Sequence, residues 1–282
     1  MRTPGWIALV LGWSAAAGAV ESPKARLELG VSAVALYLPD YRGSDRYSAR
    51  FLPVPYLVYR SERVQVTREG LRAWLFATDR LSLSLSAAVS LPGDAGGSPL
   101  RAGMPELDPT FEAGPSLDLR LHESTDGAFR TRLRFPVRAV LATDGRHFDN
   151  AGWVVSPHLR ADLSQDGGGW EISHSASLGP LWATGNYHEY FYAVAPQFMT
   201  AARPAYDVHG GYSGTRMSLS SGYGRGRWRF GVFLAYDWLR GAVFDDSPLL
   251  QTEHSVVSGV YLTYRLYQSG VAPPSPLGDA AE

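Results

Sequence analysis

The chain has 282 residues, enough for two ordinary soluble domains or for one large β architecture. Its 30 glycines and 19 prolines argue against a helical bundle or a doubly wound α/β enzyme, because both residues interrupt regular helices. The absence of cysteine excludes a disulfide framework, a thiolate nucleophile and a cysteine metal site. The formal net charge of -1, without a basic run, leaves no electrostatic footprint for nucleic acid, and we expect no such partner.

The beginning of the chain has the features of a secretory signal peptide, which we place at residues 1–19. Arg2 gives a positive start, residues 6–17 form an apolar stretch, and Ala17-Gly18-Ala19 fits a small-residue cleavage site. The apolar stretch falls short of the roughly 20 residues that span a bilayer as a helix. The sequence therefore predicts an exported chain without a transmembrane helix. A soluble periplasmic protein and an outer-membrane barrel both remain open at this point.

Alternation of apolar and polar residues predicts long β-strands. Seven stretches follow a period of two, at 81–89, 111–121, 129–141, 153–163, 170–182, 228–238 and 256–266. They are longer than ordinary globular strands and match the ~9–11 residues of a tilted membrane strand. Several begin or end in tryptophan, as aromatic girdles do. Their polar face carries too many charges for a sandwich core, so we interpret it as a wet lumen with the apolar face turned to lipid.

The connections alternate between short and long. Short ones are expected near 61–62, 77–79, 123–128, 164–168 and 224–226, and long ones at 39–49, 92–109, 142–151, 183–214 and 239–254. Outer-membrane barrels have short periplasmic turns and long outer loops. Strict alternation then requires two short strands between Arg63 and Phe76, which reverse near Glu69 and Gly70.

The predicted fold is an all-β, antiparallel up-and-down transmembrane barrel over residues 20–267. We expect twelve strands, with ten as the alternative, followed by a disordered periplasmic tail over residues 268–282. We expect a monomer embedded in outer-membrane lipid, because a closed barrel has no strand edge to pair.

Several loop segments occur in an order that resembles a known family. They lie at residues 35–45, 103–109, 187–194, 203–207, 211–215 and 239–249. Together they resemble the MltA-interacting protein family, also called MipA/OmpV, over nearly the whole mature chain. Ala193 departs from this pattern, because a glycine is expected there. Gly259, Leu262 and Tyr264 look like the terminal assembly signal of outer-membrane barrels.

The resemblance implies an outer-membrane scaffold that links a lytic transglycosylase to a murein synthase in cell-wall growth. This is our leading prediction, although turns of about five residues offer little surface beside the ~800 Å² per partner of a standard interface. Other family members look like porins or adhesins. A small porin or solute channel with an arginine-lined lumen is therefore the first alternative, and an outer-membrane hydrolase or adhesin is the second.

Charged residues gather on the polar face of the predicted strands. The expected lumen-facing ladder consists of Arg130, Arg132, Arg134, Arg138, Glu112, Asp118, Arg160 and Asp162. One interpretation is an anion-selective constriction, since rings of arginine favour anions. The other is a lumen packed with arginine–carboxylate pairs that hold the barrel rigid. We favour the second, because carboxylates on the same face can balance the charge.

Four aromatic residues cluster in the longest predicted loop, namely Tyr187, Tyr190, Phe191 and Tyr192. They could dock a partner or a glycan, because aromatic residues are enriched at binding hot spots. Alternatively, they lie at the membrane rim or fold the loop back over the barrel mouth, which we favour.

Catalytic signals are weak. The chain has seven histidines and many serines, but no G-x-S-x-G elbow. Nucleophile and base can come from distant strands, so the hydrolase alternative stays open. Loop aspartates could bind a divalent cation through hard oxygens, although solvated loop acids are far commoner. We predict no enzyme, no catalytic residue, no metal site and no cofactor.

Overall fold

The computed structural model of the chain describes residues 25–67, 70–90, 99–143 and 145–271. The expected signal peptide at 1–19 lies outside these residues. So does the part of the expected tail beyond residue 271. The final strand runs to Val271, four residues past the predicted end of the barrel at residue 267.

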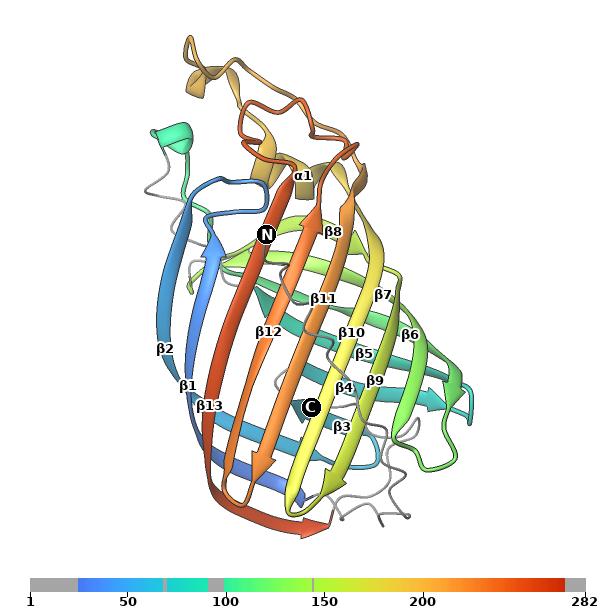
Figure 1. Cartoon of the computed structure of the whole chain (residues 1–282). Coiled ribbons are helices and arrows are strands. Elements are labelled where there is room, and N and C mark those ends of the chain that lie inside the picture. The colour runs from blue at the N-terminus through green and yellow to red at the C-terminus, as the bar shows by residue number, and fades with distance from the viewer. Residues whose placement is uncertain (1–24, 68–69, 91–98, 144, 272–282) are drawn as a thin grey trace, which may run out of the picture.

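The described chain is almost entirely antiparallel β-sheet (Figure 1). Its strands are β1 (Ala25–Pro39), β2 (Tyr47–Arg60), β3 (Val64–Thr67), β4 (Gly70–Ala77), β5 (Leu81–Ser90), β6 (Thr110–Glu123), β7 (Phe129–Thr143), β8 (Phe148–Val155), β9 (His158–Gly167), β10 (Trp170–Ala183), β11 (Gly211–Arg225), β12 (Trp228–Trp238) and β13 (His254–Val271). One α-helix, α1 (Gly185–Tyr192), and the short 3-10 turns η2 (Pro99–Arg101) and η3 (Pro196–Phe198) lie in the connections.

These strands form a closed ring of twelve positions. β1 pairs with both β2 and β13, which closes the barrel. β8 and β9 occupy a single position, because both pair with β7 along its length. The break between them falls at Ser156 and Pro157, where proline has no N–H for the ladder. The predicted twelve-stranded antiparallel barrel is confirmed.

The short strand pair that alternation requires is present. β3 has four residues and β4 has eight, and they form a hairpin between Val64 and Ala73. The reversal falls near Gly70, as predicted. β3 is the shortest strand and β4 is as short as β8, so the barrel wall is low at this point.

Two predicted connections differ from the structure. The long loop expected at 142–151 is short, because β7 continues to Thr143 and β8 begins at Phe148. The turn expected at 164–168 is displaced, because β9 continues to Gly167. Gly168 and Gly169 make that turn with φ of +60° and +80°, the left-handed values that a two-residue hairpin turn requires.

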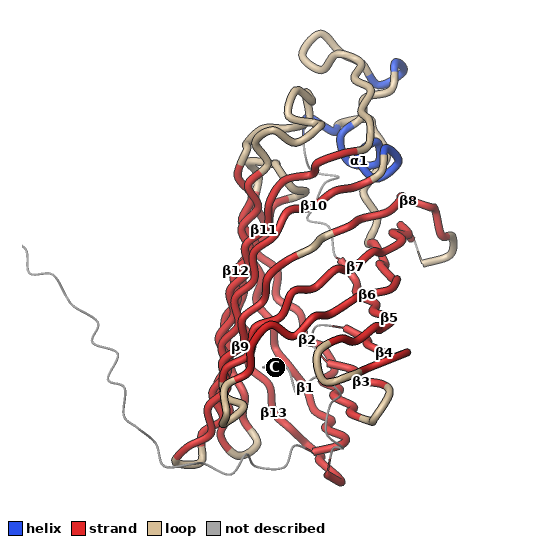
Figure 2. Tube along the Cα trace, turned by 90° about the vertical axis from the view of Figure 1, so that its right-hand side faces the viewer, coloured by secondary structure: helices blue, strands red, loops and turns tan. Residues whose placement is uncertain are grey.

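The barrel has two unlike ends. At the turn end lie the first and last described residues and short connections such as Gly226–Arg227. At the loop end lie α1 and the long connections at residues 40–46, 184–210 and 239–253. Figure 2 shows these loops gathered at one end and the short turns at the other. The parity of the strands therefore brings both ends of the described chain to one side.

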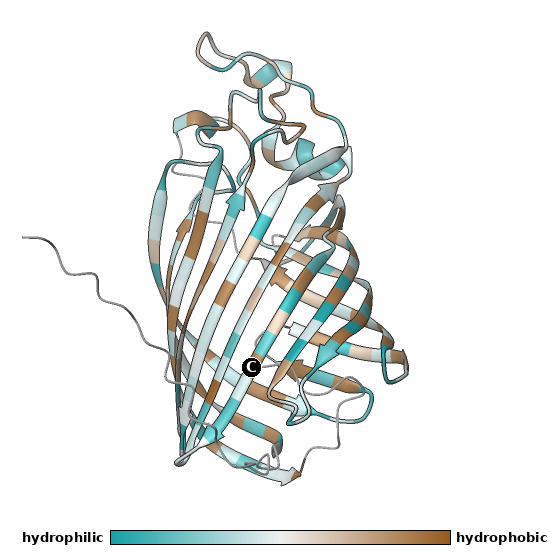
Figure 3. Ribbon diagram, turned by 45° about the vertical axis from the view of Figure 1, so that its right-hand side comes forward, coloured by the Kyte–Doolittle hydropathy of each residue, from teal (hydrophilic) through white to brown (hydrophobic). Residues whose placement is uncertain are grey.

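The outer face of the wall is apolar and the inner face is polar. Figure 3 shows hydrophobic and hydrophilic residues alternating along the strands. Large apolar side chains such as Phe51, Leu117 and Val232 are exposed. Polar side chains that point to the other face of the wall, such as Ser82, Ser84 and Asp118, are buried. This is the surface that a bilayer-spanning barrel presents to lipid. No helix of the described residues is long and apolar enough to cross a membrane.

Candidate functional site: the barrel lumen

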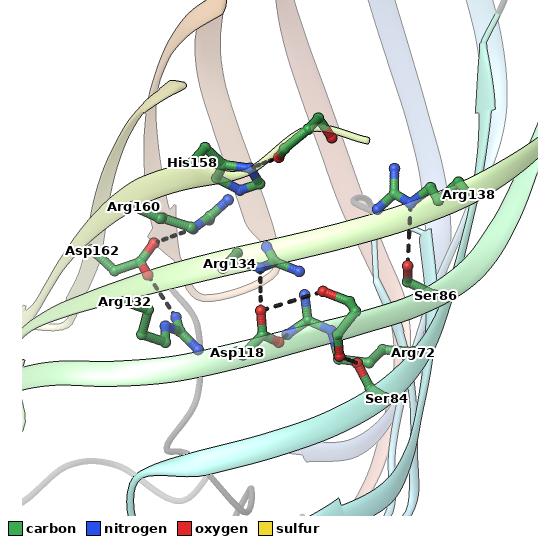
Figure 4. Close-up of polar contacts among 12 residues, drawn as sticks. Arg72, Ser84, Ser86, Asp118, Arg132, Arg134, Arg138, His158, Arg160 and Asp162 are labelled. Carbon is green, nitrogen blue, oxygen red and sulfur yellow. Dashed lines mark hydrogen bonds and ion pairs between the residues drawn. The ribbon is translucent and has the colours of Figure 1, made fainter. Parts of the chain in front are cut away.

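The inner wall carries charged side chains at matching heights on adjacent strands. Asp118 of β6 lies opposite Arg134 of β7, which lies opposite His158 of β9. One pair further along, Arg132 lies between Arg120 and Arg160. All project inward, because the residues between them are the exposed apolar ones. Figure 4 shows the side chains of Asp118, Arg134 and His158 on adjacent strands, with Arg132 and Arg160 beside them.

Two buried aspartates each bridge two arginines. Asp118, only 1% exposed, accepts from Arg134 Nε at 2.8 Å and lies 3.9 Å from Arg72 Nη1. Asp162 accepts from Arg132 at 2.6 Å and from Arg160 at 2.8 Å. Each carboxylate therefore ties neighbouring strands together through side chains as well as through the backbone ladder.

The same pattern recurs around the lumen. Arg138 lies 3.5 Å from Glu112 and donates to Ser86 Oγ at 3.2 Å. Glu123 pairs with both Arg120 and Arg130. All eight residues of the predicted ladder thus take part in ion pairs of the inner wall.

Three further carboxylates bridge arginines outside the predicted ladder, and two of them, Glu171 and Asp237, are among the inner-face acids that the alternation predicts. Glu28 of β1 accepts from Arg60 at 2.8 Å and from Arg265 at 3.2 Å. Glu171 pairs with Arg229 and Arg265, and Asp237 pairs with Arg216 and Arg42. Glu28 and Arg265 come from opposite ends of the chain. A signal was present in the period-two parity of their strands, but only barrel closure brings β1 beside β13.

Positive charge exceeds negative charge within these bridges. Among the ion pairs of the described residues, twelve arginines share seven carboxylates, so this set has five more positive than negative groups. The pairing stiffens the wall, as one of the two sequence interpretations requires. The excess of arginine is what the other interpretation, an anion-selective lumen, requires. The two interpretations are compatible.

The opposite wall is built from small and hydroxyl side chains around a cavity of about 740 Å³. This volume lies within the roughly 300–1,000 Å³ of ligand sites. The residues that line the cavity include Ser173, Ser175, Ser177, Ser218, Ser220, Thr263, Tyr56, Tyr261, Phe233, Val34 and Arg160. Hydroxyl groups can donate and accept, while the rings offer apolar surface. The cavity therefore suits a solute with both polar and apolar parts.

Glycines keep two bulky rings flat against this wall. A Cβ on Gly259 would lie 2.6 Å from Phe233 Cζ, and one on Gly231 would lie 2.4 Å from the Tyr261 hydroxyl. The rings rest on the backbone where a side chain would otherwise stand. Phe233 and Tyr261 therefore line the cavity while leaving it open.

The loop end is covered by a packed cap. Tyr41, Leu107, Tyr192, Leu239 and Phe244, from four different connections or their borders, form one buried apolar cluster. Within it the rings of Tyr192 and Phe244 stack at 3.7 Å with an interplanar angle of 5°. Figure 1 shows α1 among these loops at the end of the barrel. The cap is thus held by its own hydrophobic core.

The aromatic cluster of the longest loop belongs to this cap. Tyr187 and Tyr190 pack against buried apolar residues of β7, β8 and β10 at the loop end. Tyr190 Oη accepts from the Asp108 backbone N–H at 2.8 Å, and the rings of Tyr190 and Phe191 make an edge contact at 4.9 Å. These contacts fold the loop over the barrel mouth.

Polar groups anchor the cap to the barrel. Arg42, from the first loop, donates to the Ser213 carbonyl at 2.8 Å and lies 3.3 Å from Asp237. Burial opposes the charge on Arg42, but the Asp237 carboxylate outweighs this effect and raises the pKa of the guanidinium. His188 is fully buried and donates from Nδ1 to the His209 carbonyl at 2.9 Å. Burial lowers the pKa of the His188 imidazole.

A histidine–serine pair lies outside the lumen. His174 Nδ1 lies 2.9 Å from Ser221 Oγ, but this pair stands on the outer face of β10 and β11, away from the lumen. Over the described ranges there is also no group of three or more His, Asp or Glu that could hold a metal ion.

Comparison with known proteins identifies the family. The sequence profile of the MltA-interacting protein MipA matches residues 31–266, which is most of the chain. The chain belongs to the MipA family. No curated protein matches this MipA-family chain.

Solved structures resemble the MipA-family barrel only distantly. LpxR from Salmonella typhimurium is 11% identical with a TM-score of 0.47, over 83% of this chain and 99% of that one. The NanC porin is 8% identical with a TM-score of 0.40, over 84% and 100%. The CymD monoaromatic hydrocarbon channel is 12% identical with a TM-score of 0.31, over 86% and 89%.

Proposed function

We propose that this protein is a small-solute channel of the Gram-negative outer membrane whose lumen favours anions. The apolar outer face and the family membership support the location in that membrane. Under this proposal the turn end faces the periplasm and the loop end faces outward, because outer-membrane barrels carry their long loops outside. Cleavage of residues 1–19 as a signal peptide is part of the proposal.

The excess of arginine over carboxylate in the lumen carries this proposal. A low-dielectric wall focuses the field of these charges into the interior and raises the local concentration of anions. Arginine rings select anions in other pores. Arg160 lines the 740 Å³ cavity directly, so a solute in the cavity meets a guanidinium.

Ion selectivity in planar bilayers tests the channel. With a KCl gradient across a bilayer that holds the refolded barrel, the reversal potential should report chloride selectivity. Arg160→Gln should reduce that selectivity, whereas Arg240→Gln, an exposed loop arginine, should leave it unchanged. Conductance no higher than background, or a preference for potassium, would rule the channel out.

A second candidate is a scaffold for murein enzymes, supported by the description of the family as MltA-interacting. In this role the barrel would bind a lytic transglycosylase and a murein synthase at its periplasmic end. The turn-end connections, such as Gly226–Arg227, are short and offer little surface beside the ~800 Å² per partner of a standard interface. We therefore rank the scaffold below the channel.

Crosslinking in living cells tests the scaffold. A lytic transglycosylase and a murein synthase should copurify with the barrel from detergent-extracted outer membrane. Deleting residues 272–282 would then show whether the contact lies in the tail. Recovery of other outer-membrane proteins alone would exclude the scaffold.

A further inference from the structure

One strand of the barrel has a long edge with no strand beside it. β2 pairs with β1 over thirteen residues, from Tyr47 to Tyr59. On its other edge it pairs with β3 only at Tyr59↔Val66 and Arg60↔Gln65. Within the described chain, β3 ends at Thr67 and no other strand takes its place. Between residues 47 and 58, β2 therefore has no second neighbouring strand among the described residues.

Two prolines reduce the hydrogen-bonding donors on this edge. The Ser61 N–H donates to the Val64 carbonyl, so odd-numbered residues here direct their backbone groups toward β3. Pro53 and Pro55 have the same parity, and neither has an N–H. Proline within sheets is confined to edges and bulges. An unsatisfied N–H in a bilayer costs several kcal/mol, so the two prolines lower the cost of an open edge there.

The unpaired edge lies in the apolar belt. Phe51 and Leu57 point outward from β2 and are 69% and 45% exposed. Side chains of this kind, exposed over the whole outer wall, contact acyl chains in a bilayer-spanning barrel. The medium beside this edge is therefore lipid.

The lumen cavity reaches the same edge from the inside. Four successive residues of β2, from Val54 to Leu57, line the cavity together with Thr67 at the end of β3. In a continuous wall the alternate residues 55 and 57 would be screened from the interior by neighbouring strands. The cavity also contacts Arg160 and the serines of β10 and β11 on its far side. An apolar entrance thus leads to a polar, positively charged wall.

We propose that the gap beside β2 is a lateral opening that admits a single-chain anionic amphiphile, such as a fatty acid, from the bilayer into the lumen. The apolar chain would lie against Val34, Val54 and Phe233, and the carboxylate would face Arg160. The cap covers the loop end with a hydrophobic core of its own, whereas the gap beside β2 gives an apolar chain a route to the cavity that starts in the bilayer. This inference rests on the proposed channel only in naming an anionic solute.

Spin labels test the opening. The chain has no cysteine, so single cysteines can be placed at Val54, which points inward beside the gap, and at Ala235, which points inward from a continuous wall. Val232 points outward and serves as the lipid reference. In phosphatidylcholine vesicles, the nitroxide at position 54 should collide with oxygen as often as the one at 232. The nitroxide at 235 should instead collide mainly with a water-soluble nickel complex.

Palmitate binding tests the solute class. Palmitate should bind the purified barrel saturably, and Arg160→Gln should weaken the affinity by about tenfold or more, as expected for loss of one charged contact. Arg240→Gln should leave the affinity unchanged. Absence of saturable binding would overturn the amphiphile as the solute.

The outcomes separate this inference from the channel. A nitroxide at position 54 as water-exposed as that at 235 would overturn the lateral opening, even if the barrel conducts chloride. A lipid-exposed position 54 in a barrel without conductance would overturn the channel alone. Disulfide-linked dimers of the Val54→Cys variant in membranes would show that a second copy covers the edge, which also overturns the opening.

Discussion

At the scale of single residues, the lumen depends on carboxylates that are shared between arginines. Asp118 has Arg134 and Arg72 as neighbours, and Asp162 has Arg132 and Arg160. Burying a charge costs several kcal/mol, and the cost is recovered only when the partners are well placed. A bridging carboxylate stabilises two guanidinium groups at once, so its loss leaves two buried charges without their anion.

Asp118→Asn should destabilise the barrel strongly. The substitution keeps the shape of the side chain but removes the charge that faces two arginines. We expect a loss of about 3–5 kcal/mol in the free energy of unfolding, measured by urea denaturation in lipid vesicles. Glu112→Gln is the matched control, because Glu112 is less buried and lies 3.5 Å from Arg138, and it should cost less than about 1 kcal/mol. Equal losses would contradict the shared-carboxylate account.

His188 should make the cap sensitive to acid. Burial lowers its pKa in the folded cap, where nearby Arg42 and His209 also disfavour a positive charge. The opened loop has the ordinary histidine pKa of about 6.5. The contribution of neutral His188 to cap stability is therefore complete above about pH 6.5 and is lost as the pH falls toward the folded pKa.

Hydrogen exchange measures this effect. The amides of α1, after correction for intrinsic exchange rates, should lose protection when the pH falls from about 7.5 to about 5. These two values lie on either side of the ordinary histidine pKa. His188→Gln cannot titrate, so the ratio of protection at the two pH values should stay near one. The same loss in both proteins would show that another group is responsible.

At the scale of elements, the cap and the barrel are held mainly by different kinds of contact. The cap cluster draws Tyr192 from α1 and Phe244 from the last loop, whereas the wall is held by backbone ladders and ion pairs. The cap can therefore open without unfolding the barrel, as loops of low local stability do.

Phe244→Ala should open the cap selectively. Removing a fully buried ring that stacks on Tyr192 costs about 3–5 kcal/mol. Because this cost falls on the loops, hydrogen exchange in residues 185–192 should accelerate while exchange in β10 and β11 stays slow. Met199→Ala, which changes an exposed side chain in the loop that contains α1, should change neither. Accelerated exchange throughout the barrel would show that cap and wall are one cooperative unit.

The prolines of β2 should keep its free edge from pairing with other chains. The double variant Pro53→Val, Pro55→Val restores two N–H groups where no strand is present to accept them. An edge with free donors pairs with other chains, so we expect dimers or larger species by light scattering in detergent micelles. Phe51→Val, which changes a side chain on the same strand but no donor, should remain like the parent protein. A double variant that stays like the parent would argue that the edge has other protection.

At the scale of the whole molecule, the charged residues of the lumen act through one summed electrostatic field rather than as separate ion pairs. The excess charge is spread over strands from β2 to β13, and it sums in a narrow interior. A solute therefore responds to the total charge as well as to its nearest arginine.

Chloride selectivity should fall as salt rises. The Debye length shrinks from about 10 Å at 0.1 M to about 3 Å at 1 M, which screens the summed field across the lumen. Reversal potentials measured at a fixed KCl ratio should move toward zero between these concentrations. A selectivity that does not depend on salt would point to direct contact with single arginines instead.

The sequence by itself determined the barrel. Period-two alternation depends on local geometry, because successive side chains of a strand point to opposite faces. It therefore placed β5, β6, β7, β10 and β12 closely and put the charged ladder on one face. The strict alternation of short and long connections between the two ends of the barrel required the β3–β4 hairpin. That hairpin has only twelve residues in its strands and a weak pattern of its own. The predicted length of the connection at 142–151 was wrong, because the ends of β7 and β8 depend on how these two strands pair with each other.

Only the tertiary structure decided which groups meet. The Glu28–Arg265 pair joins residues 237 positions apart, and it exists because β1 and β13 close the ring. The cap core likewise joins four connections whose local sequences carry no signal for one another. The free edge of β2 depends on where β3 ends, which is a property of pairing across strands. Alternation fixes the face of a side chain, but closure, register and loop packing fix its neighbours, and these act between residues distant in the chain.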